Sequence, residues 1–139
     1  MSDASSPLPP SSLRDGAGTL VFATLVLCSA FGEVSTGLLV PALPRLGDLF
    51  GASPARVQLT LVAFAVAFAT GQLAFGPFSD RRGRRTALRI GAGLTLAGSL
   101  AAALAGDLAS VVAARSVQGL GAAAGYVVAR AMVRDLYGA

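Results

Sequence analysis

The sequence predicts an all-α integral membrane protein with four transmembrane helices. Hydrophobic residues make up 54% of the 139 residues, charged residues only 13%, and the mean hydropathy is +0.69. Soluble domains carry about 25% charged residues, so this chain has too few charges to cover a surface that faces water. Residues 57–79 contain no charge, and a helix of that length crosses a hydrocarbon core of about 30 Å.

The first part of the chain divides into a tail and a span. Residues 1–16 are rich in proline and serine and poor in apolar residues, so we expect a disordered cytoplasmic tail. Residues 17–139 form the transmembrane region, whose first helix covers about residues 19–40 and stops before Pro41 and Pro44. This apolar run is longer than the apolar core of a cleaved signal peptide, which has about 7 to 15 residues. We therefore expect it to span the membrane.

Three further helices follow a short amphipathic link over residues 42–56. Ser53 and Pro54 form a plausible N-cap and first residue for the second helix. The predicted bounds of these helices are about 54–78, 85–106 and 108–133. Small residues let helices approach closely in lipid, so those of the last two helices are expected to pack. They include Gly91, Gly93, Ala97, Gly98, Gly119, Gly121, Ala123 and Gly125.

The arginines predict the orientation. Five of the eleven basic residues fall within the nine positions 81–89, between the second and third helices. The link before the second helix holds two arginines, and the turn after the third holds none. Because short cytoplasmic loops carry an excess of basic residues, both termini are expected in the cytoplasm. We also expect the chain to be a multi-pass protein of the plasma (inner) membrane. The basic residues lie mostly at the ends of apolar runs, so no nucleic-acid partner is expected.

Two charges lie inside the predicted helices, Glu33 in the first and Arg115 in the fourth. Placing a charge at the centre of a membrane helix costs roughly 2.5 to 3.5 kcal/mol, so such a residue usually faces a cavity or a partner. Each lies seven residues from the outer end of its helix, about 10 Å deep. We predict that the two line a proton or substrate cavity, with Gln118 on the same face as Arg115.

Two motifs resemble signatures of the major facilitator superfamily. The first follows the pattern G-x-x-x-D-R-x-G-R-R, and its residues are Gly76, Asp80, Arg81, Gly83, Arg84 and Arg85. The second, R-x-x-Q-G, begins at Arg115 and ends at Gly119. Further stretches, including Pro41–Pro44 and Ala129–Tyr137, are similar to drug exporters of the bicyclomycin and chloramphenicol resistance type. The resemblance implies four helices equal to the first part of a twelve-helix major facilitator fold.

The resemblance also implies a function and a gate. It implies proton-coupled efflux of drugs or other small organic molecules, with a proton gradient and no cofactor or bound metal. The first motif is a cytoplasmic gating motif in that family, a latch in which Arg84 reaches acidic groups such as Asp135. We expect Gly76 and Gly83 to allow close helix approach and a tight turn. Asp80 is expected near the start of the third helix, where a carboxylate is favoured.

Two departures from the family pattern leave alternatives open. An acidic residue usual in the first helix is replaced by Gly37, and Glu33, one turn away, could take its role. The length also predicts a truncated N-terminal portion whose remaining C-terminal helices would be partners, alongside lipid, substrate and protons. One alternative is a complete four-helix small multidrug exporter that uses Glu33. Another is a non-transporting membrane fragment that pairs with a separate half.

An enzyme is not expected. The chain contains no His, and no nucleophile-and-base pair, metal-ligand cluster or phosphate loop is recognisable in it.

Overall fold

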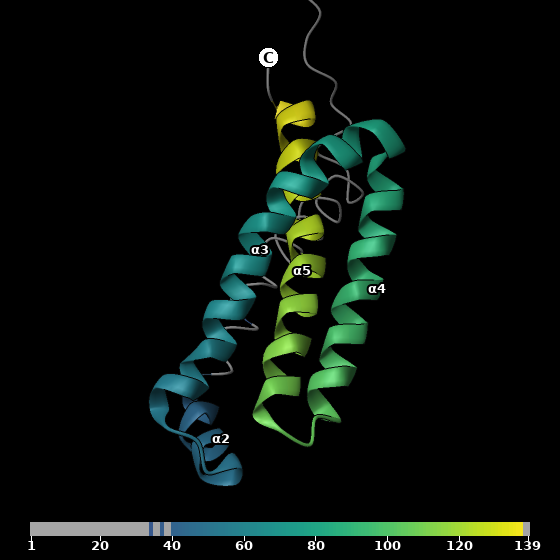
Figure 1. Ribbon diagram of the computed structural model, residues 1–139. Helices are drawn as coiled ribbons and strands as arrows, with labels where there is room; N and C mark the ends of the chain where they lie inside the picture. The colour runs from purple at the N-terminus through teal and green to yellow at the C-terminus, as the bar shows by residue number, and fades with distance from the viewer. Residues whose placement is uncertain (1–33, 35–36, 38–39, 138–139) are drawn as a thin grey trace, which may run out of the picture.

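The computed structural model describes residues 34, 37 and 40–137, and these residues form a bundle of helices (Figure 1). The order is a short 3-10 helix η2 (Val40–Ala42), α2 (Leu43–Phe50), α3 (Pro54–Arg82), α4 (Arg84–Ala103) and α5 (Leu108–Tyr137). The predicted tail, nearly all of the predicted first helix and Glu33 lie outside the described residues.

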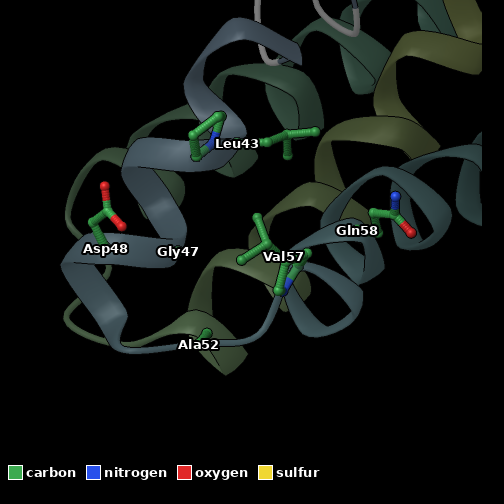
Figure 2. Close-up of a pocket in the computed structure, with 8 residues that line it drawn as sticks. Leu43, Gly47, Asp48, Ala52, Val57 and Gln58 are labelled. Carbon is green, nitrogen blue, oxygen red and sulfur yellow. The ribbon is translucent and has the colours of Figure 1, made fainter.

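The link before the first long helix contains α2, a helix of eight residues. Gly51 ends α2 in a left-handed conformation (φ 56°), and its N–H donates to the carbonyl oxygen of Gly47. Ser53 is then the N-cap of α3, with Pro54 as its first helical residue. In Figure 2, α2 lies beside the first turns of α3, across an apolar groove of about 410 Å³ that Val57 and Gly47 help to line.

Three described helices are long and apolar enough to cross a membrane: Pro54–Arg82, Arg84–Ala103 and Leu108–Met132 of α5. Two of them extend past their predicted ends, since α3 continues to Arg82 and α5 to Tyr137. Arginine is a good helix former and suits the C-terminal end of the helix dipole, so Arg81 and Arg82 do not stop α3. In contrast, α4 ends at Ala103, three residues before its predicted end.

The helix α5 lies between α3 and α4 (Figure 1). Within the most apolar stretch of 18 residues in each helix, 56% of α5 is buried inside the bundle, compared with 22% of α3 and 22% of α4. The core cluster joins all three helices and consists of Phe75, Ala87, Ala123, Ala124 and Val128. The bundle is therefore organised around α5, and α3 and α4 leave most of their apolar surface exposed.

Small residues bring the backbones of these helices together. A Cβ atom on Gly98 of α4 would lie 2.6 Å from the backbone nitrogen of Gln118 and 2.9 Å from the carbonyl oxygen of Ala114. On the other side, a Cβ on Gly119 would lie 2.5 Å from the carbonyl oxygen of Phe64 in α3. These distances are shorter than van der Waals contact, so only glycine fits at either position.

The turn between α3 and α4 corrects one expectation about the first motif. Gly83 has φ 86°, which residues with a side chain rarely adopt, so the tight turn is as predicted. No described atom comes within 4 Å of a Cβ placed on Gly76, so the close approach expected there stays a prediction. Asp80 lies in the last turn of α3, not near the start of α4, because α3 continues as far as Arg82.

The opposite turn, between α4 and α5, holds a helix cap. The Oδ1 atom of Asp107 accepts a hydrogen bond of 2.8 Å from the backbone N–H of Ser110, and Oδ2 accepts one of 3.1 Å from its hydroxyl. These bonds favour the charged form and lower the pKa of the Asp107 carboxyl. Asp107 thereby satisfies one of the free N–H groups at the start of α5.

The glycine contacts predict the effect of one added methyl group. Replacing Gly98→Ala should push α4 and α5 apart and lower the free energy of unfolding by about 1 to 3 kcal/mol, the usual cost of overpacking. Gly93→Ala is the matched control, because no atom of the described residues lies within 4 Å of a Cβ at Gly93. The two variants would be compared by the SDS fraction at which helicity is lost. Equal midpoints would show that the two helices are not closely packed.

Candidate functional site

A buried polar network crosses from α5 to α4 inside the bundle. Arg115 and Gln118 on α5 are 5% and 8% exposed. The Nη1 atom of Arg115 donates to Oε1 of Gln118 (2.5 Å), and Nε2 of Gln118 donates to the hydroxyl oxygen of Ser99 (2.9 Å). The Ser99 hydroxyl in turn donates to the carbonyl oxygen of Thr95 (2.8 Å). Gln118 therefore holds Arg115 by one end and α4 by the other.

An aromatic ring from α3 covers the same arginine. The Cζ atom of Arg115 lies 4.4 Å from the ring centroid of Phe64, a distance at which the ring face attracts a cation. Phe64 is itself buried and stacks on Phe68, with 6.0 Å between the ring centroids. Arg115 thus contacts a side chain of α3 directly and is linked to α4 through Gln118.

The hydrogen-bonding capacity of Arg115 is only partly used. Its Nε and Nη2 atoms are buried and have no hydrogen-bond partner among the described residues. A buried guanidinium with unmet donors is costly in a low-dielectric environment. The arrangement therefore offers at least two N–H groups to a carboxylate or another acceptor. Arg115 and Gln118 lie on the same face of α5 and are hydrogen-bonded to each other. Their role in a cavity stays a prediction, and Glu33 lies outside the described residues.

The residues of the first motif lie at the opposite end of α5, around the turn between α3 and α4. Asp80, Arg81 and Arg85 are exposed, and Arg84 is half-buried. Asp135 belongs to the final turns of α5, and its side chain is outside the described part of the chain. The predicted latch of Asp80, Arg84 and Asp135 thus stays a prediction.

Sequence reasoning missed several residues at these two places. Phe64, Ser99 and Thr95 take part in the buried network or its cover, but apolar or small residues inside an apolar run give no signal of their own. Arg130 and Arg134 were not among the predicted site residues. They are four residues apart, so they lie on one face of α5, and this spacing was a signal that the sequence offered.

Comparison with known proteins gives one family. Residues 25–139 match the family described as Major Facilitator Superfamily. No solved structure matches the chain.

Three relatives illustrate the similarity. An uncharacterized MFS-type transporter of Bacillus subtilis is 39% identical over 81% of this chain and 28% of its own length. Multidrug resistance protein D of Escherichia coli is 33% identical over 81% of this chain and 29% of its own length. The chloramphenicol resistance protein of Pseudomonas aeruginosa is 37% identical over 83% of this chain and 28% of its own length. The chain thus spans less than a third of the length of these relatives.

The network predicts that Arg115 depends on Gln118. Gln118→Leu keeps the side-chain volume but removes both hydrogen bonds, so the free energy of unfolding should fall by about 1.5 to 3 kcal/mol. The control is Ser116→Ala, which removes only a bond from Ser116 to the carbonyl oxygen of Val112 on the same helix. SDS titration of helicity measures both variants. If Gln118→Leu unfolds no earlier than the control, the network does not stabilise the bundle.

Proposed function

The chain belongs to the major facilitator superfamily, and on this basis we propose that it supplies the opening helices of a transporter that exports drugs or other small organic molecules in exchange for protons. The relatives whose names include multidrug or chloramphenicol resistance support the substrate class. The arginine-rich turn between α3 and α4 supports an orientation with both termini in the cytoplasm of a cell with a plasma (inner) membrane. Lipid, substrate, protons and the remaining helices of the transporter are the partners of this proposal.

The single observation that carries the proposal is the buried, incompletely paired Arg115. Its Nε and Nη2 donors, which have no partner among the described residues, provide a place for a carboxylate inside the membrane span. A carboxyl group close to Arg115 stays ionised, whereas one that moves away in a dehydrated cavity takes up a proton. Glu33 is the proposed carboxyl group. Its affinity for protons would then change with the conformation of the transporter, which is what coupling to a proton gradient requires.

The first motif supplies the proposed gate. Transporters of this fold expose a central site alternately to each side of the membrane by rocking two halves against one another. Charged groups at the ends of helices can favour one of the two states only if their contacts differ between them. We assign this role to the latch of Asp80, Arg84 and Asp135, supported by Gly83 at the tight turn and by Arg81 and Arg85.

Exchange of segments tests the function of the chain. The matching segment of the chloramphenicol resistance protein of Pseudomonas aeruginosa would be replaced by the segment from this chain, and everted vesicles would be assayed for proton release when chloramphenicol is added. An active hybrid supports the proposal. A hybrid that reaches the membrane in normal amounts without transporting the drug contradicts it.

The first prediction from this hybrid concerns proton coupling. Glu33→Gln should reduce drug-driven proton release to the level of vesicles without the hybrid, because the amide can neither bind nor release a proton. Glu33→Asp keeps a carboxyl group and should retain part of the activity. Undiminished proton release from the Glu33→Gln hybrid would assign the coupling to another residue.

The second prediction concerns the latch. Asp80→Asn should lower transport per inserted molecule by about 5-fold or more, which is the lower range of measured coupling between protein states. Immunoblots of the membrane fraction provide the amount of inserted protein. Arg89→Gln is the control, since Arg89 is exposed on α4 and outside the motif. If the Asp80→Asn variant inserts poorly but each inserted molecule transports normally, Asp80 affects only the insertion and topology of the chain and not its gating.

A further inference from the structure

A groove of about 660 Å³ lies between α3 and α5 near the arginine-rich end of the bundle. Its apolar walls include Leu73 and Pro77 from α3 and Val127 from α5. Leu73 is 80% exposed, so this wall is open to its surroundings. Three charged side chains line the groove, Asp80 from α3 and Arg130 and Arg134 from α5.

The two arginines form a pair on one face of α5. They are four residues apart, and both are exposed. Arg130 is held in place by Tyr126, because its Nη1 donates to the Tyr126 hydroxyl oxygen (3.3 Å) and its Cζ lies 5.4 Å from the Tyr126 ring centroid. The Tyr126 ring packs edge-on against Phe68, with 5.6 Å between the centroids. Arg130 is thus oriented while most of its five N–H donors stay available.

The depth of this pair suits the membrane interface. Residues 116–129 of α5 carry no charged side chain, and Arg130 is the first charged residue after them. Arginines at the end of a span lie at the level of lipid headgroups, and the apolar groove walls continue toward the hydrocarbon. Two guanidinium groups face one carboxylate, so the described charges of the groove leave a net charge of +1. A ligand with a negative head and an apolar tail matches this distribution.

We propose that the groove binds an anionic phospholipid, with its phosphate on Arg130 and Arg134 and an acyl chain along the apolar walls. Arginine forms paired hydrogen bonds with phosphate oxygens, which favours it over a simple point charge. The exposed apolar wall favours a lipid over free phosphate, because a free phosphate ion has no apolar part to bury there. This proposal concerns a structural lipid and does not require the chain to transport anything.

Native mass spectrometry of the full chain in detergent tests the site. The chain would be titrated with dioleoyl phosphatidylglycerol, with the zwitterionic dioleoyl phosphatidylcholine, and with inorganic phosphate. We expect one phosphatidylglycerol molecule to bind more tightly than phosphatidylcholine. The double variant R130Q/R134Q should bind it about 30-fold more weakly, from about 5-fold for each basic residue at a membrane surface.

The control variant is R85Q/R89Q, which removes an equally spaced pair of exposed arginines from α4 at the same end of the bundle. It should keep its affinity for phosphatidylglycerol, and R130K/R134K should lose only part of it. Unchanged phosphatidylcholine binding by R130Q/R134Q shows that the variant is folded. An equal loss in R85Q/R89Q would overturn the site in favour of diffuse surface charge. Equal binding of the two lipids, or equal occupancy by inorganic phosphate, would also overturn it.

Discussion

The close approach of α5 to both of its neighbours is the constraint on which the rest of the structure depends. Glycine at position 98 lets α4 touch the backbone of α5 at Gln118, and glycine at 119 does the same for α3 at Phe64. Lipid offers apolar side chains the same environment that a neighbouring helix does, so contact between backbones and polar bonds must hold such helices together. The polar network around Arg115 lies at this point of contact.

The network and the glycine contacts support one another. Gln118 reaches the Ser99 hydroxyl because its own backbone lies against Gly98, the residue next to Ser99. Phe64 covers the guanidinium of Arg115 because Gly119 lets that turn of α3 approach α5. A side chain at either glycine would therefore separate helices and also move the groups that hold the buried charge. This explains why two small residues lie within one helical turn of the polar network.

The sequence was sufficient for the helical class, the three described spans and the shared face of Arg115 and Gln118, because apolar runs and a spacing of three residues are local signals. It was insufficient for the place of Asp80, because the exact end of a helix is hard to predict from local sequence, and α3 continues through Arg81 to Arg82. Gly71 shows the same limit. A close contact needs a neighbour as well as a glycine, and only the three-dimensional arrangement shows that Gly71 packs against α5 at Leu120 and Ala123.

The arginines of α5 show how depth decides the role of one side chain. Arg115 and Arg130 are fifteen residues apart, about 22 Å along the helix, and each lies beside an aromatic ring. Around Arg115 the protein excludes water, so the two donors that no described residue satisfies require a well-placed acceptor from protein or substrate. Around Arg130 the ring only orients a group that is already exposed, so water or a headgroup can complete its bonds. The same residue type thus makes one end of α5 a surface for anions, while its interior demands a specific charged partner.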